Sequence, residues 1–196
     1  MSDKLILLGI PSRLQVLFDL RSAVFSYGDS KETFCLSAHL VPSSRNLWIA
    51  GNESAREVLI GRSAMEIIAF LSLNLQRYPQ PEKLCLIALG NRPGIGQLNW
   101  IRKHFKRRKF TLLFEDDLTG RATDVVVAAG LRMRSIYLLW SVQGIMVSCN
   151  NRSVRFRPDE LSLNNFELAF SIRTGVRARK AKKNTTFLNQ LRYATS

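Results

Sequence analysis

The sequence predicts an α/β sandwich in which a central, mainly parallel four-stranded sheet follows a β-rich N-terminal extension. The first observation is that apolar runs of strand length alternate with segments of helical periodicity from Arg56 onward. Strands joined by helices of this length pair in parallel through right-handed crossovers. The second observation is that the apolar run at residues 110–114 stops at three consecutive carboxylates. Open α/β sheets bind their ligands at such strand ends, so the site is expected there.

The N-terminal extension, residues 1–57, contains two kinds of segment. Two apolar runs separated by glycine and proline, at residues 5–8 and 16–20, suit either short strands or one strand and a short helix. Two later apolar segments, at residues 34–40 and 47–50, follow turn residues. This later pattern predicts antiparallel strands that add to the following sheet.

Residues 58–172 form the predicted α/β domain. Its four strands are the apolar runs at residues 58–60, 84–89, 110–114 and 136–140. Its helices are the segments in which apolar residues recur at helical spacing, at residues 65–75, 95–105 and 122–129. Pro79 and Pro81 stop the first helix. Short strands at residues 145–148 and 154–156 and a short helix within residues 161–170 are expected after Gly144.

Charge points to a polyanionic partner. The 196 residues include 29 Lys and Arg against 15 Asp and Glu, which gives a net charge of +14. Nucleic acid is the first candidate and an anionic membrane surface the second. No apolar run approaches the roughly 20 residues of a spanning helix, so we expect a cytoplasmic protein without a membrane partner. Cys35, Cys85 and Cys149 are too far apart for a disulfide set or a zinc pattern.

Two groups of cations are the predicted nucleic-acid contacts. The first places six positive charges in eight residues at the end of a helix, which exceeds what a helix C-terminus requires: Arg102, Lys103, Lys106, Arg107, Arg108 and Lys109. The second lies in residues 173–196, a basic C-terminal tail expected to be a solvated, mobile arm: Arg177, Arg179, Lys180, Lys182 and Lys183.

The acidic turn consists of Glu115, Asp116 and Asp117. Adjacent carboxylates repel one another, and a divalent cation, arginine or lysine, or water can relieve the repulsion. Acids also suit the N-terminus of the helix that follows. The residues alone leave these alternatives open.

Three segments, VLIGRSAMEIIAFLSL, LCLIALGNRPGIGQLNWIRKHF and FTLLFEDDLTGRA, resemble the Toprim (topoisomerase-primase) domain family. The resemblance covers residues 58–140 and is closest to divergent Toprim variants of primase-like and mobile-element proteins. It implies a Toprim-like sandwich. In that family a D-x-D motif followed by glycine holds Mg²⁺, so the resemblance implies Glu115 and Asp117, with Gly120 after them, as metal ligands and Mg²⁺ as cofactor.

One position departs from the family pattern. The family has a catalytic glutamate just after its first strand, where this chain has Arg62. Arginine stays protonated and cannot shuttle protons, so we expect Arg62 to form an ion pair with the acidic turn. Glu66 is the remaining candidate for the catalytic acid, although it lies one helical turn, about 6 Å, further along.

Two functions follow from the resemblance, and the sequence leaves open whether the chain is an enzyme. We favour a catalytically degenerate, Toprim-like nucleic-acid-binding protein that acts in DNA processing or mobilisation within a larger complex. It would bind DNA rather than RNA, beside a protein partner that supplies other activities. The alternative is a Mg²⁺-dependent primase-like or strand-cleaving phosphoryl-transfer enzyme.

Overall fold

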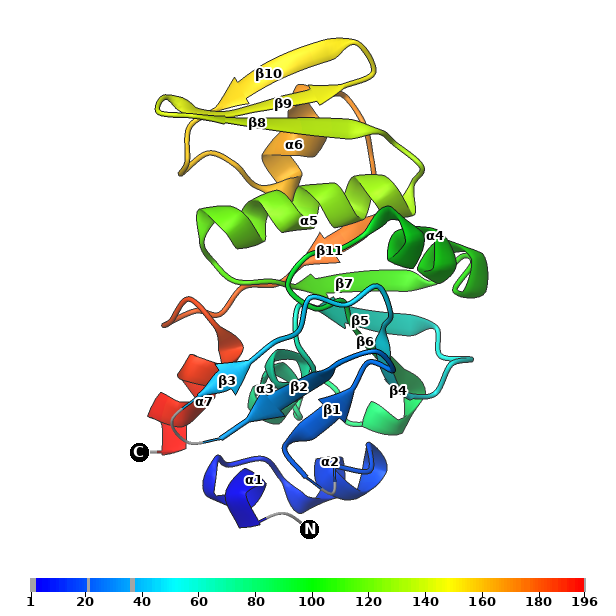
Figure 1. Cartoon of the computed structure of the whole chain (residues 1–196), viewed down its shortest axis with the longest axis vertical. Helices are drawn as coiled ribbons and strands as arrows, with labels where there is room; N and C mark the ends of the chain where they lie inside the picture. Colours follow the sequence, from blue (N-terminus) through cyan, green and yellow to red (C-terminus); the bar gives the residue numbers. More distant parts are fainter. Residues whose placement is uncertain (1–2, 21, 36–37, 196) are drawn as a thin grey trace.

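The computed structural model describes residues 3–20, 22–35 and 38–195 and shows a mixed α/β fold in stacked layers (Figure 1). A five-stranded sheet with the order β11-β7-β5-β6-β4 lies at its centre. The strands are β4 (Trp48–Gly51), β5 (Glu57–Gly61), β6 (Leu84–Ala88), β7 (Lys109–Leu113) and β11 (Val176–Ala178). Strands β6, β5, β7 and β11 run parallel, and β4 pairs antiparallel with β6. The sheet is therefore mixed and mostly parallel.

Helices cover both faces of this sheet. They are α3 (Ala64–Leu73) and α7 (Phe187–Thr195) on one face, and α4 (Ile95–His104) and α5 (Leu118–Leu131) on the other. Side chains alternate between the faces of a strand. Leu59 of β5 accordingly joins the core beside α3, whereas Val58 and Ile60 join the core beside α4 and α5. Because both faces are buried, the strands read as continuous apolar runs.

The N-terminal layer packs against α3 and is only partly β-structure. Its helices are α1 (Asp3–Leu7) and α2 (Ser12–Leu17), and its antiparallel sheet contains β1 (Val24–Ser26), β2 (Lys31–Phe34) and β3 (His39–Leu40). The two apolar runs that were open to strand or helix therefore both contribute to helices. Of the two segments expected to add antiparallel strands to the central sheet, residues 47–50 do so as part of β4. The expectation is wrong for residues 34–40, whose described residues contribute to β2 and β3 of the separate sheet.

The prediction that residues 136–140 form a fourth parallel strand of the central sheet is wrong. These residues belong to β8 (Ile136–Ser141), which pairs antiparallel with β9 (Gly144–Cys149); β10 (Arg152–Phe156) completes a separate three-stranded sheet. Helix α6 (Leu163–Ala169) follows, as expected. The turn at Gly144 pairs β8 with its sequence neighbour, and Tyr137 and Leu139 remain exposed. A strand inside a parallel sheet would bury both faces.

The predicted mobile tail is instead part of the folded core. Strand β11 pairs with β7 and takes the place in the sheet that residues 136–140 were expected to fill. Helix α7 buries Phe187, Leu188 and Leu191 against α3. These apolar residues share one helical face, so burying them offsets the cost of ordering a cation-rich segment. A single turn of 3-10 helix, η1 (Pro81–Lys83), leads into β6.

Candidate functional site

The predicted site residues lie at two opposite ends of the central sheet. The acidic turn follows the carboxyl end of β7, whereas Lys109 and the basic residues before it lie at the amino end of the same strand. The five residues of β7 span roughly 16 Å. The basic cluster therefore does not form one site with the acidic turn.

At the carboxyl end, Arg62 and Glu115 face each other from neighbouring strands. Arg62 follows β5 and Glu115 follows β7, and β5 pairs in parallel with β7. The Nε atom of Arg62 lies 2.7 Å from Oε1 of Glu115, and the Glu115 side chain is only 11% exposed. This confirms the ion pair expected between Arg62 and the acidic turn. Glu115 is the most buried of the three acids of the turn, and the positive charge of Arg62 compensates its negative charge.

The other two acids of the turn hold its connection to α5. Asp117 is the N-cap of α5, and its Oδ1 accepts a hydrogen bond of 2.7 Å from the Gly120 amide. Asp116 forms an ion pair of 3.0 Å with Arg121. A Cβ atom on Gly120 would overlap the backbone of Glu115, so the first turn of α5 packs directly on the acidic turn. This close packing by itself explains why glycine occupies position 120.

Glu66, the predicted catalytic candidate, caps α7. Its side chain is buried, and Oε2 accepts hydrogen bonds of 2.9 Å from the Phe187 amide and 3.2 Å from the Leu188 amide. Burial raises the pKa of Glu66 to about 7, and the negative charge of Glu115 adds to the shift. Glu66 therefore holds two distant segments of the chain together at the N-terminus of a helix.

A carboxylate that the sequence analysis missed lies at the N-terminus of α3, which begins two residues after Arg62. Glu32 of β2 is fully buried and accepts hydrogen bonds from the amides of Ala64, at 2.8 Å, and Met65, at 3.0 Å. The Tyr27 hydroxyl, at 2.9 Å, and His39 Nε2, at 2.9 Å, complete its contacts. Glu32 thus satisfies the N-terminal amides of α3 at the carboxyl end of β5. No local sequence pattern predicts this role of Glu32. Strand β2 is distant in sequence from α3, and the contact between them depends on the tertiary fold.

Lys180, a predicted nucleic-acid contact, instead contacts groups of the protein itself. Its Nζ donates to the carbonyl oxygens of Phe114, at 3.2 Å, and Glu115, at 2.8 Å, and lies 2.6 Å from Oδ2 of Asp124. Burial raises the pKa of Asp124 to about 6, against the opposing effect of Lys180. The pair borders a cavity of about 480 Å³ that Arg121 also lines.

The acidic turn does not fit a magnesium ion in this arrangement. Within the described residues, no group of three or more His, Cys, Asp or Glu side chains is placed to hold a metal. The charge of Glu115 is matched by Arg62, and Asp117 is engaged as a helix cap. A divalent cation at Glu115 would also be repelled by the guanidinium group.

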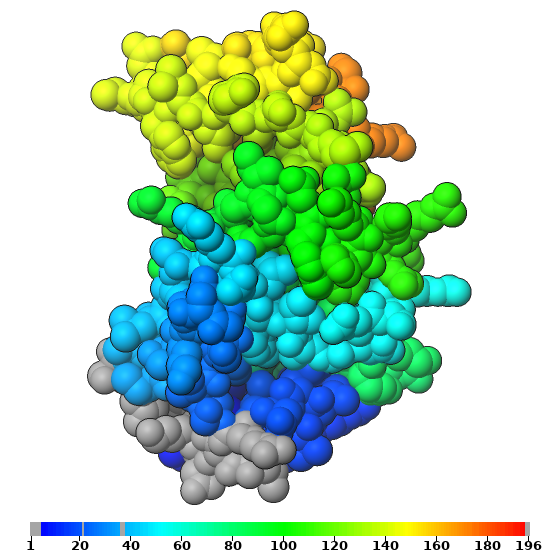
Figure 2. Space-filling model, turned by 45° about the vertical axis from the view of Figure 1, so that its right-hand side comes forward, coloured from blue at the N-terminus to red at the C-terminus, as the bar shows by residue number. Residues whose placement is uncertain are grey.

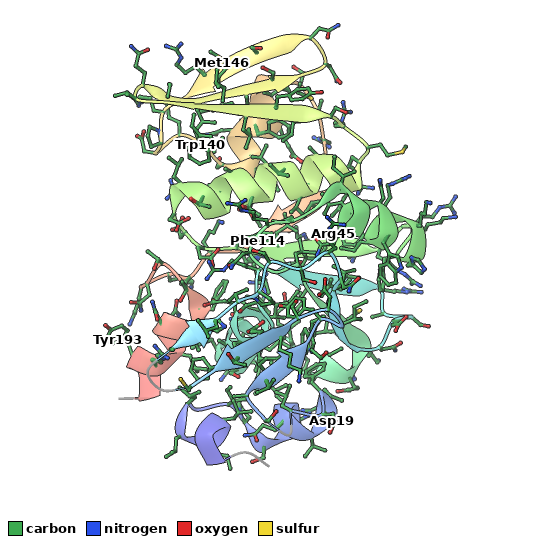
Figure 3. The ribbon with its side chains drawn as sticks, in the orientation of Figure 1. Asp19, Arg45, Phe114, Trp140, Met146 and Tyr193 are labelled. Atoms are coloured by element: carbon green, nitrogen blue, oxygen red, sulfur yellow. The ribbon has the colours of Figure 1, made fainter. Side chains whose placement is uncertain are left out.

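The amino end of the sheet carries a surface of a different kind. Five cations line a hollow of about 390 Å³ between the C-terminal ends of α4 and α5, here called the basic pocket: Arg102, Lys103, Lys106, Arg107 and Arg132. Figure 2 shows the surface of α4 in green on an open face of the molecule, and Figure 3 shows nitrogen-tipped side chains projecting from this end of α4. No acid occurs in the sequence between Glu82 and Glu115.

In the described chain, the cations at residues 102–109 have no acidic partners, whereas Arg132 donates from Nε to the Thr174 carbonyl oxygen. In the described part of the chain, no acidic side chain forms an ion pair with any of the six predicted contacts at residues 102–109. The Nε atoms of Arg102 and Arg108 are buried and find no hydrogen-bond partner among these residues. Unmatched guanidinium groups are available to an anionic ligand.

The predicted contacts in the C-terminal segment are spread over several places. Arg177 and Arg179 lie on or next to β11, the edge strand of the central sheet, and the exposed Lys182 and Lys183 lie in the connection to α7. Lys180 makes its contacts inside the protein, so the cations of the C-terminal segment lie at three separate places. They do not form one continuous basic arm.

Comparison with protein-family models, with curated proteins and with solved structures found no match to this chain. Within the described residues, no helix is both long enough and apolar enough to cross a membrane.

Proposed function

We propose that this chain is a Toprim-like protein that binds nucleic acid through the basic pocket and acts in DNA processing or mobilisation within a larger complex. The observation that carries this proposal is the hollow lined by five cations at the C-terminal ends of α4 and α5, in which the four cations of α4 and the residues after it form no ion pair with an acidic side chain among the described residues. Helix C-termini favour cations, but one or two suffice for that purpose. A hollow lined by five cations offers several contacts to the phosphates of a polyanion.

Salt dependence tests the binding proposal. Each phosphate contact that replaces a condensed counterion steepens the fall of affinity with salt, by a slope of about 0.9 on a double-logarithmic plot for duplex DNA. Fluorescence anisotropy with a labelled oligonucleotide at several salt concentrations should give a slope of about 4 or 5, one unit for each cation of the basic pocket. Affinity that does not change with salt would remove nucleic acid as the partner.

We further propose that the acidic turn is catalytically silent. The ion pair between Arg62 and Glu115 supports this, because the arginine occupies the position from which a Toprim glutamate would act and neutralises the neighbouring carboxylate. The turn then has a structural role, since Asp117 holds the start of α5. Two buried acids outside the turn, Glu32 and Glu66, hold the starts of α3 and α7 in the same way.

Two measurements test the silent site. Mg²⁺-dependent nicking, relaxation and primer synthesis are expected to be absent, and robust activity that Asp117→Ala abolishes would contradict this. In the second measurement, Arg62→Glu brings a carboxylate to Glu115. Mg²⁺ should raise the Tm of this variant and leave the wild-type Tm unchanged. A Mg²⁺-dependent rise for the wild type would show that the turn binds the ion despite Arg62.

A further inference from the structure

A second hollow adjoins the basic pocket and shares Arg102 and Met133 with it. This apolar groove, of about 360 Å³, lies between α4, the C-terminal end of α5 and the start of β8. Three large apolar side chains on it are mostly exposed: Ile95 at 80%, Met133 at 71% and Tyr137 at 75%. Single exposed apolar residues are common, but three around one groove indicate a surface that another molecule covers.

The groove combines an aromatic ring with flanking cations. Tyr137 lines it together with Arg102 and Arg134, and Arg102 also lines the basic pocket. A ligand that follows both hollows would therefore meet several cations and then a flat apolar ring within a short distance. Phosphates alternate with flat bases in this way along a nucleic-acid strand.

We infer that the basic pocket and the apolar groove together hold a single-stranded segment of nucleic acid, with phosphates in the pocket and an unstacked base against Tyr137 in the groove. This rests on the proposed nucleic-acid binding and names the form of nucleic acid. In a duplex the base faces are stacked on one another and cannot reach Tyr137, so a duplex would use the cations alone.

The position of this site separates it from the acidic turn. The groove and pocket lie on the face of the sheet that carries α4 and α5. The pocket lies at the C-terminal ends of these helices, toward the amino ends of the parallel strands, and the groove extends from it along α4 to Ile95. The acidic turn follows the opposite, carboxyl end of β7. Strand binding at the groove therefore needs neither Glu115 nor a metal ion.

Anisotropy with labelled oligonucleotides of one length, as a single strand and as a duplex, tests this inference on the full chain. The wild type should bind the single strand about tenfold more tightly, because stacking contributes roughly 1–3 kcal/mol per base. Tyr137→Ala should remove most of that preference and leave duplex affinity unchanged, whereas Tyr137→Phe should keep it. Tyr193→Ala is the matched control, because Tyr193 on α7 is also 75% exposed, and it should change neither affinity.

The outcomes separate the two proposals. Salt-dependent binding of equal strength to both forms, unaffected by Tyr137→Ala, would overturn the single-strand inference and leave the proposed function standing. Salt-independent binding, or no binding to either form, would overturn both. A loss that Tyr193→Ala reproduces would also overturn the inference, because the effect would not be specific to the groove.

Discussion

At the carboxyl end of the central sheet each acid of the turn has a partner within the protein, whereas at the amino end none of the cations at residues 102–109 pairs with an acidic side chain among the described residues. Glu115 pairs with Arg62, Asp116 with Arg121, and Asp117 with a helix amide. Partly buried charges must be matched internally or they destabilise the fold. Exposed cations at the amino end, such as Lys103 and Lys106, carry no such cost and remain available to a ligand.

This difference teaches which charges are structural and which are available. Three consecutive carboxylates in a basic chain are a candidate site in the sequence. In the structure, their contacts hold the start of α5 and connect the ends of β5 and β7. The cations at the other end could be explained as a solvated helix end, yet they line a shared hollow. The groups that contact a charged side chain indicate its role better than the clustering of charges in the sequence does.

The largest expected effect tests how tightly the acidic end is packed. Gly120→Ala should lower the free energy of unfolding by about 3 kcal/mol, because the new Cβ would overlap the Glu115 backbone. Gly96→Ala is the control, since Gly96 also lies in the first turn of a helix and a Cβ there meets nothing within 4 Å. That variant should be neutral or stabilised by up to about 1 kcal/mol. Equal urea denaturation curves for both variants would contradict the close packing.

The second prediction concerns the basic end. The double variant Lys103→Glu, Lys106→Glu should lower affinity for a single strand by about 100-fold and flatten the salt dependence by about two units of slope. Both side chains are exposed, so the fold should persist. Lys182→Glu, Lys183→Glu makes the same change in net charge elsewhere and should weaken binding only severalfold. Equal losses would show that net charge, and not the basic pocket, controls binding.

The third prediction uses pH to probe the buried acids. The pKa of Glu66 is raised to about 7 and that of Asp124 to about 6, so the folded state keeps protons that the unfolded chain releases. The contribution of these two groups to stability should therefore fall as pH rises, by about 2 kcal/mol between about pH 5 and about pH 7 for Glu66. Urea denaturation at the two pH values checks this.

Glu66→Gln should remove this part of the pH dependence, because the amide carbonyl still accepts from Phe187 and Leu188 but does not titrate. Asp159→Asn is the control, since the Asp159 side chain is 75% exposed. An unchanged slope in the Glu66 variant would show that another group controls the titration.

The smallest expected effect comes from the ion pair itself. Arg62→Gln should cost about 1 kcal/mol, because Arg62 is partly solvated while Glu115 is mostly buried and loses its cation. Arg157→Gln removes the ion pairs to Asp159 and Glu160, in which every side chain is exposed, and its effect on stability should be near zero. Thermal unfolding of the two variants distinguishes them. A larger loss for Arg157 would contradict the assignment of Arg62 as the compensating charge.

The sequence by itself determined the parts of this protein that depend on local pattern. Apolar periodicity located β5, β6 and β7 and the helices after them, because burial imposes a period on a segment whatever its distant neighbours are. Parallel strands also bring their carboxyl ends together. The pairing of Arg62 with Glu115 could therefore be anticipated from their positions just after β5 and β7.

Only the tertiary structure decided which segments complete the sheet and what each charge contacts. Residues 136–140 are a continuous apolar run and residues 176–178 have an arginine at their centre, yet the first segment forms a hairpin and the second pairs with β7. Glu32, Glu66 and Lys180 meet their partners across long stretches of chain. Such contacts depend on which surfaces remain unpaired after the local elements form, and periodicity within a segment carries no information about them.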